Sequence, residues 1–205
     1  MGSRDRGKAT HGAKAVAALK DVRSVLEGQA CWLAEENVDF IIAETFDRLD
    51  EAFVAMEVVQ ALKLPVMVTM SWRENDRMST DGFGIAECAK QLKDGGADII
   101  GFNCRREPDK MIAVIQEMRS AVEGPIAVQP WGLRSLKTRG IELRSGLLGN
   151  NEVDPEISER IQICCQEWNE FSRKACDLGV SYLGACCGAG PSAIRGMAEA
   201  MGKST

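Results

Sequence analysis

Short apolar runs alternate along this chain with longer segments of helical periodicity. Five runs are the strand candidates, at residues 38–45, 65–71, 97–103, 125–130 and 180–185. Strands that are apolar on both faces are typical of sheets covered by helices, and strands separated by helices pair in parallel. The pattern therefore predicts an α/β fold with five βα units.

The segments between the apolar runs predict the helices. We expect helices at residues 49–62, 84–94, 108–122, 154–178 and 191–201, and one more at 13–36, before the first strand. Boundary residues support these limits, because Asp47, Pro108 and Pro191 stand at helix starts. Glycines at 95–96 and 179 stand where helices end before strands.

The number of βα units restricts the architecture. With 205 residues and 45% hydrophobic content, the chain predicts one globular domain over residues 13–205. Residues 1–12 predict a flexible N-terminal segment. A closed eight-stranded barrel takes ~250 residues. Five units therefore leave two alternatives, a doubly wound open sheet and part of a barrel.

Composition excludes several classes of function. The net charge is −5 with acidic and basic residues interspersed, whereas a nucleic-acid surface shows a basic stripe. The longest uncharged stretch, residues 178–194, is rich in Gly and Ser and is no membrane span. No apolar signal segment opens the chain. Eight cysteines without such a signal predict free or metal-bound thiols in a reducing cytoplasm.

Chemically unusual residues follow the ends of all five predicted strands. These pairs are Glu44-Thr45, Ser71-Trp72, Asn103-Cys104, Gln129-Pro130 and Cys186-Cys187. Parallel α/β folds and β/α barrels both build their sites at the C-terminal ends of the strands. We therefore expect the functional site at this edge of the sheet.

Three of the cysteines predict a metal site. Cys104 follows the third run, and Cys186-Cys187 follow the fifth, before a glycine-rich turn. Three converging thiolates would bind zinc and leave its fourth position open for another thiol. The alternative is that each cysteine fills the core, which is preferred for those on helical patterns. These five are Cys31, Cys88, Cys164, Cys165 and Cys176.

Further signals remain ambiguous from the sequence. Glu44 suits a substrate ammonium or a general base, and equally a cap of the following helix. The turn at 188–190 precedes a helix and could bind phosphate. A vicinal disulfide at Cys186-Cys187 is a strained alternative. The segment 131–153 is long for a βα connection, which is typical of functional or disordered loops. His11 is the single histidine.

Three stretches together resemble the homocysteine S-methyltransferase family, most closely its betaine–homocysteine branch. They are NVDFIIAE at 37–44, GGADIIGFNC at 95–104 and LGVSYLGACCGAGPSAIR at 178–195. The resemblance implies a (β/α)8 TIM-barrel type fold, of which this chain holds about the last five units. It also implies a zinc ion bound by Cys104, Cys186 and Cys187, with Glu44, Thr45 and Asn103 on the substrate side.

The implied reaction is methyl transfer from an onium donor, betaine or similar, to the thiol of homocysteine, which gives methionine. Three family features have no counterpart here: the early strands, much of the donor pocket and the C-terminal arm. Thr45 stands where the betaine branch has tyrosine. The alternative is therefore a non-catalytic or partner-dependent zinc-binding remnant. An incomplete barrel exposes strand edges that favour a homo-oligomer or another association.

Overall fold

Five parallel strands form one sheet in the computed structural model, which describes residues 13–73, 76–134 and 162–203, with side chains from residue 19 onward. The strand order is β1-β2-β3-β4-β5, the order of the sequence, and every neighbouring pair is parallel. The strands are β1 (Ile41–Phe46), β2 (Val66–Met70), β3 (Ile99–Asn103), β4 (Ile126–Gln129) and β5 (Tyr182–Leu183).

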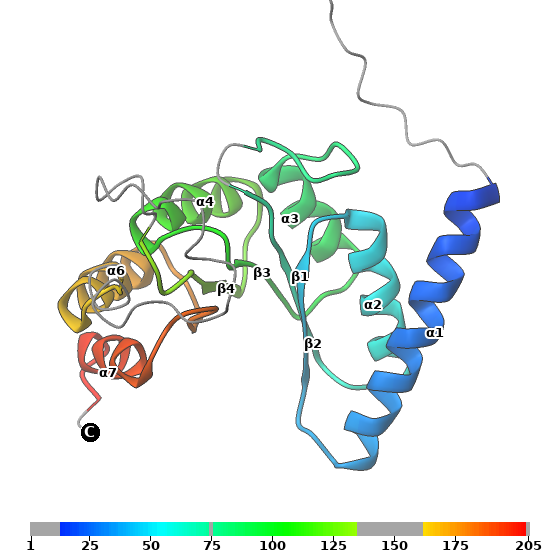
Figure 1. The fold of residues 1–205 in the computed structure, drawn as a ribbon, viewed down its shortest axis with the longest axis horizontal. Helices are drawn as coiled ribbons and strands as arrows, with labels where there is room; N and C mark the ends of the chain where they lie inside the picture. Colours follow the sequence, from blue (N-terminus) through cyan, green and yellow to red (C-terminus); the bar gives the residue numbers. More distant parts are fainter. Residues whose placement is uncertain (1–12, 74–75, 135–161, 204–205) are drawn as a thin grey trace, which may run out of the picture.

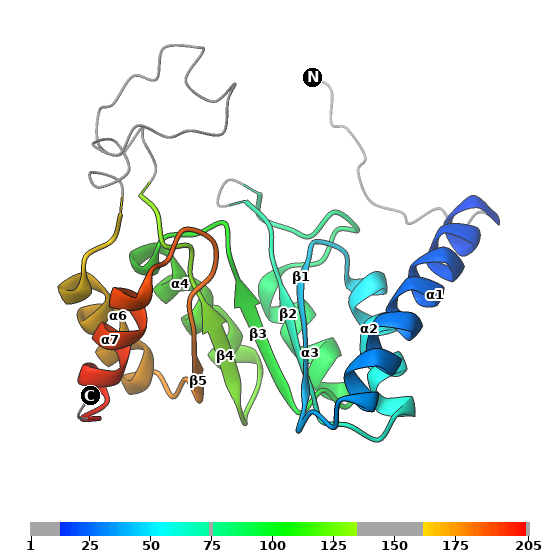
Figure 2. The ribbon, with the colours of Figure 1, turned by 60° about the horizontal axis from the view of Figure 1, so that its bottom comes forward.

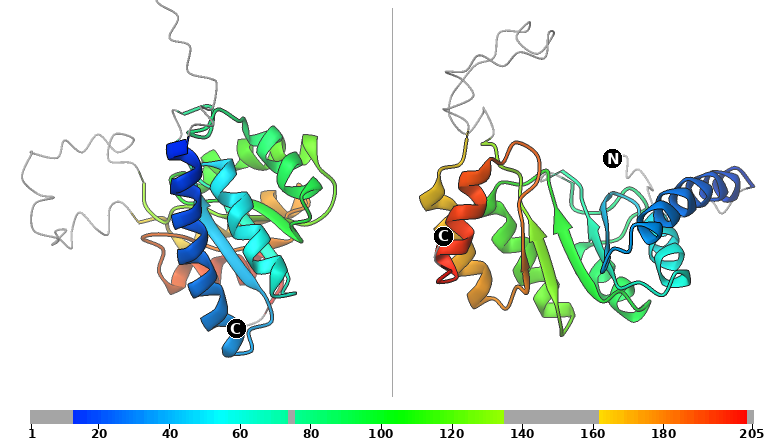
Figure 3. Two further views of the ribbon diagram at one scale, coloured as in Figure 1. Left: turned by 90° about the vertical axis from the view of Figure 1, so that its right-hand side faces the viewer. Right: turned by 90° about the horizontal axis from the view of Figure 1, so that it is seen from below.

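The helices line the sheet in the order of the chain (Figures 1 and 2). Contacts join α3 to α4, α4 to α6 and α6 to α7, while α1 lies against α2 at the opposite end (Figure 3). The bounds are α1 (Ala13–Glu35), α2 (Leu49–Ala61), α3 (Ile85–Asp94), α4 (Pro108–Ala121), α6 (Cys165–Asp177) and α7 (Pro191–Ala200).

The strand order decides between the two predicted architectures. A doubly wound sheet reverses its strand order at a switch point, and its helices cover both faces. Here the order never reverses, so successive right-handed crossovers place the helices on one face. The fold is therefore of the β/α-barrel type with five consecutive units, as expected. Within the described residues, β1 and β5 each have one neighbouring strand.

The main core lies between the sheet and the helices. Ile100, Phe102 and Val128 contribute from the strands, and Met111 and Trp168 from the helices, all with at most 1% of their surface exposed. Burial of a large apolar side chain contributes about 1.5–3 kcal/mol. The opposite, inner face of the sheet is therefore the one left for polar strand-end residues.

One helix is capped differently from the prediction, and one predicted helix boundary is wrong. No side chain of the preceding residues caps α2; instead, Asp81 from the loop before α3 accepts the N–H groups of Leu49 and Asp50 at 2.8 and 3.1 Å. The helix predicted at 154–178 is not continuous, because residues 162–164 are not helical and α6 begins at Cys165. Residues 154–161 lie outside the described residues, as do 1–12 and 135–153.

The five helical-pattern cysteines do not share one environment. Cys88 is buried in α3, as predicted, but Cys31, Cys164 and Cys176 are exposed, and Cys165 is partly exposed. The error is one of helix phase. For example, Ala30 enters the core, and one residue further round α1 the Cys31 side chain faces solvent. Among the described residues, no helix is long and apolar enough to span a bilayer.

We expect Cys88 to resist alkylation in the folded protein. Burial raises the pKa of its thiol to about 12, and the nearby Asp81 adds to the shift, so the reactive thiolate is scarce at pH 8. Cys88 should react with iodoacetamide at least ~100-fold more slowly than exposed Cys176. Peptide mass spectrometry after timed quenching measures both rates. Equal alkylation rates of Cys88 and Cys176 in the folded protein would contradict the burial of Cys88. In urea, which unfolds the protein, the two rates should become equal.

Candidate metal centre

Three thiols meet at the C-terminal edge of the sheet. The sulfur atoms of Cys104, Cys186 and Cys187 all lie within 4.8 Å of one another. The Sγ atoms of Cys186 and Cys187 are 3.8 Å apart, and all three cysteines are free. Two sulfurs bonded tetrahedrally to one zinc-sized ion at ~2.3 Å are separated by about 3.8 Å. The spacing of the trio therefore fits a shared metal ion.

The end of β4 holds the two cysteine loops in place. The backbone carbonyl of Gln129 accepts the N–H of Cys104 at 2.8 Å, and the carbonyl of Pro130 accepts the N–H of Cys186 at 2.8 Å. Cys104 and Arg105 both adopt positive φ, 56° and 51°, so the chain turns sharply after β3. Such sparsely populated conformations cost about 1–3 kcal/mol each and persist where surrounding contacts fix them.

The glycine-rich turn after Cys187 is closely packed. A Cβ at Gly188 would lie 2.3 Å from Cγ of Leu133, and one at Gly132 would lie 2.3 Å from the backbone nitrogen of Ala189. The Cys187 carbonyl accepts the N–H of Gly132 at 2.9 Å. These glycines therefore permit close chain packing. Because Leu133 fills the space beside Gly188, the turn gives little support to the alternative of a phosphate site.

A bulge in β1 presents Glu44 and Thr45 at the same edge. Ala43 pairs with Val68 and Phe46 with Met70, so two residues of β1 stand opposite one residue of β2. Thr45 has φ of 69°, which is a rare conformation for a β-branched residue. Bulges commonly redirect side chains beside active sites. Here the bulge leaves both Glu44 and Thr45 exposed at the strand end.

The side chain of Asn103 connects this bulge to the thiols. It is fully buried, and its Oδ1 accepts the Thr45 N–H at 3.0 Å and the Thr69 hydroxyl at 2.9 Å. Its Nδ2 donates to Thr45 Oγ1 at 2.7 Å and to Glu44 Oε2 at 3.1 Å. The same nitrogen lies 3.8 Å from the Sγ of Cys186.

These contacts bear on one of the two interpretations of Glu44. Asp81 caps α2, so Glu44 is not the helix cap that the sequence left open. Its carboxylate is held by Asn103 and faces solvent beside the thiols. An exposed carboxylate at the same strand edge as three clustered thiols suits a ligand that carries both a thiol and a positive charge.

The Cys186 thiol holds its proton firmly. Burial, together with the neighbouring Cys104 thiol, raises the pKa of the Cys186 thiol to about 12. A metal ion must therefore displace this proton when it binds, as thiolate ligation requires. An all-sulfur donor set favours soft or borderline metals. With three ligands of a tetrahedral site supplied by protein, one position remains for another ligand.

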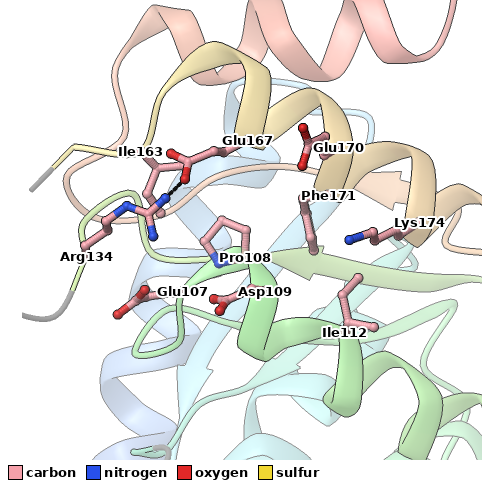
Figure 4. A pocket seen from close by; sticks show the side chains of 10 residues that line it. All are labelled: Glu107, Pro108, Asp109, Ile112, Arg134, Ile163, Glu167, Glu170, Phe171 and Lys174. Carbon is pink, nitrogen blue, oxygen red and sulfur yellow. Dashed lines mark ion pairs between the residues drawn. The ribbon is translucent and has the colours of Figure 1, made fainter. Parts of the chain in front are cut away.

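A separate cavity of about 370 Å³ lies between α4 and α6 (Figure 4). Its wall carries the acidic side chains of Glu107, Asp109, Glu167 and Glu170, together with Arg134 and Lys174. Arg134 forms an ion pair with Glu167. None of the three clustered cysteines lines this cavity, so it is distinct from the thiol trio. No sequence motif indicated it, because its residues come from three separate segments.

The sequence comparisons agree with the geometry. A model of the family described as "Homocysteine S-methyltransferase" matches residues 6–201. The rat protein named S-methylmethionine--homocysteine S-methyltransferase BHMT2 is 32% identical over 186 residues, which cover 87% of this chain and 48% of that protein. Bovine betaine--homocysteine S-methyltransferase 1 is 33% identical over 189 residues, which cover 87% of this chain and 44% of that protein. The chain therefore spans about half the length of these relatives.

Solved structures show the same fold. The apo form of the homocysteine methyltransferase MmuM from Escherichia coli superposes with a TM-score of 0.64 at 14% identity, over 95% of this chain and 59% of that one. Its metallated form gives 0.63 at 15% identity, over 94% of this chain and 53% of that one. At such low identity the match supports the barrel-type fold alone.

We expect Asn103→Ala to destabilise the protein. The substitution leaves the Thr45 N–H and the Thr69 hydroxyl without their buried acceptor, and it removes the support of the bulge. The free energy of unfolding should fall by about 2–4 kcal/mol in the metal-free protein, as urea titration measures. Asn169→Ala, on α6, is the matched control and should change it by less than about 0.5 kcal/mol. Similar losses in both variants would contradict a special role for Asn103.

Proposed function

The chain belongs to the homocysteine S-methyltransferase family, and we propose that it transfers a methyl group from an onium donor, such as betaine, to the thiol of homocysteine, which gives methionine. One observation carries the proposal: three sulfurs within 4.8 Å of one another, with a protein-held carboxylate beside them. Groups suited to binding a metal ion and an amino acid thus lie at one strand edge.

We assign zinc to the thiol trio. Cys104, Cys186 and Cys187 would hold the ion, because their all-sulfur donor set and spacing fit its preferences. When bound, zinc would supply Lewis-acid stabilisation that makes an incoming thiol a thiolate at neutral pH. The nearby Asn103 amide would fix the orientation of the Cys186 sulfur through its N–H, a common arrangement around metal ligands.

The substrate amino group would bind at Glu44. Homocysteine carries an α-ammonium, and an exposed carboxylate accepts a charge-assisted hydrogen bond from such a group. Asn103 and the bulge hold Glu44 at the required edge, and Thr45 lies beside it. We therefore place Glu44 and Thr45 in contact with substrate. Asn103 would support substrate binding through Glu44. The Oδ1 and Nδ2 atoms of Asn103 already bond protein groups.

The proposed transfer is an in-line displacement. The thiol of homocysteine, with an ordinary pKa of ~8.5, loses its proton to solvent before the attack. A lone pair of its sulfur then forms a bond with the methyl carbon. The bond from that carbon to the onium nitrogen or sulfur breaks, and its electron pair neutralises the leaving group. Holding both substrates in line lowers the entropic cost of the reaction.

The edge strands and the partial length of the chain favour a second candidate function. Within the described residues, β1 and β5 are the edge strands of the sheet. The chain spans only about half the length of the relatives that it matches. The alternative is a zinc-binding unit that needs a partner, a second copy or another chain segment, to provide the donor side. Unpaired strand edges favour such association. The eight free cysteines fit a reducing cytoplasm in either case.

We expect Cys104→Ser to lose zinc. Purified under reducing conditions and reconstituted with zinc, the wild type should retain one ion per chain after dialysis. Removal of one sulfur ligand should weaken zinc binding at least ~100-fold. Competition with a chromogenic chelator measures the affinity. Cys176→Ser changes an exposed helical thiol and should leave it unaltered. Wild-type zinc affinity in Cys104→Ser would refute the ligand assignment.

A donor panel tests the proposed activity. The zinc-loaded chain, with homocysteine and betaine, S-methylmethionine or S-adenosylmethionine, should form methionine with at least one donor. Glu44→Gln should raise the KM for homocysteine about 10- to 100-fold, because the ammonium loses its charged partner. Mass-spectrometric methionine assay measures both results. Zinc binding without turnover on any donor would support the partner-dependent alternative instead.

A further inference from the structure

Polar side chains form one layer across the inner face of the sheet. Asn103 on β3 is in register with Gln129 on β4, so both side chains leave the sheet on the same face. The adjacent Val128 points the other way, into the core under the helices. Because Asn103 contacts Glu44 and lies near Cys186, Gln129 belongs to the face that carries the thiol trio.

The carboxamide oxygen of Gln129 has no hydrogen-bond donor among the described residues. Only 9% of the residue surface is exposed, and the Oε1 atom is fully buried. The side chain lies against β5, where a Cβ at Gly184 would be 2.9 Å from Gln129 Cγ. A glycine at this position therefore leaves room for the glutamine. The fold accommodates a polar side chain here without satisfying it.

Gln129 stands between the two loops that carry the thiols. Its backbone carbonyl accepts the N–H of Cys104, and the next carbonyl, that of Pro130, accepts the N–H of Cys186. On the sheet, Asn103 separates Gln129 from the Glu44 bulge. Asn103 cannot donate to Gln129 readily, because its Nδ2 already faces Thr45, Glu44 and Cys186. None of the described residues supplies the missing donor.

A buried carbonyl without a donor is costly, and native proteins keep few of them. The amino-acid thiol of the proposed function brings the matching group, an ammonium with three N–H donors. Glu44 carries one negative charge and can accept from part of that ammonium only. A neutral acceptor on β4, beside Asn103 on β3, can take a further N–H without adding charge. A simple thiol has no group that could do this.

We propose that the Oε1 of Gln129 accepts an N–H from the α-ammonium of the bound amino-acid thiol, and that this contact makes the site select α-amino thiols over thiols without an amino group. This inference rests on the proposed function. Gln129 is then a substrate-contacting residue that determines specificity together with Glu44.

Gln129→Met tests the contact with two ligands. Methionine keeps the length of the side chain and removes both polar atoms. Isothermal titration calorimetry on the zinc-loaded full chain compares homocysteine with 4-mercaptobutyrate, which has the same skeleton without the amino group. Homocysteine should bind about 10- to 100-fold more weakly to the variant. Binding of 4-mercaptobutyrate should change by less than about 2-fold, because it makes no N–H contact.

Stability separates this role from a structural one. If Gln129 Oε1 bonds only the substrate, the ligand-free protein loses no hydrogen bond on substitution. Gln129→Met should then melt at the same temperature as the wild type or higher. A structural hydrogen bond predicts a lower melting temperature. Gln166→Met is the control, because Gln166 lies exposed on α6 and donates to Glu170 at 3.1 Å. It should change neither thiol affinity.

The outcomes distinguish the inference from the function on which it rests. Equal weakening of both thiols, unchanged homocysteine affinity or a lowered melting temperature in Gln129→Met would overturn the contact alone. If the zinc-loaded wild type binds no homocysteine, the proposed function fails and the contact fails with it.

Discussion

The buried carboxamide of Asn103 is the interaction on which the site depends. It accepts from the Thr45 N–H and the Thr69 hydroxyl, and it donates to Thr45 and Glu44. These bonds hold a β-branched residue in a left-handed conformation that would otherwise cost about 1–3 kcal/mol. The Asn103 Nδ2 atom also lies 3.8 Å from the Sγ of Cys186. One side chain therefore fixes the acidic and the sulfur sides of the site relative to each other.

The parallel sheet makes this convergence possible. Residues that are far apart in the sequence meet because the strands end at one edge, and β4 then extends the pairing beyond the regular ladder. The carbonyls of Gln129 and Pro130 bind the amides of Cys104 and Cys186. Rigid support of this kind matters for a metal site, because ligand sulfurs must keep their spacing to within a few tenths of an ångström.

Local patterns predicted the strands, most helices and the meeting of Cys104 with Cys186-Cys187, because apolar periodicity and strand-end position are local in sequence. Long-range contacts explain the failures. Asp81, about thirty residues away, caps α2 in place of the adjacent Asp47. The bulge at Glu44-Thr45 follows from pairing with β2 and from Asn103. The unsatisfied oxygen of Gln129 is visible only once its neighbours on β3 and β5 are placed.

The charges at the strand edge explain why this site would use cationic substrates. With the proposed metal bound, three thiolates and Glu44 would carry four negative charges, which a divalent ion would reduce to two. The α-ammonium and the onium group of the proposed substrates would each bring one positive charge toward this edge. After transfer the donor has lost its positive charge, so its attraction to the edge falls and its release is favoured.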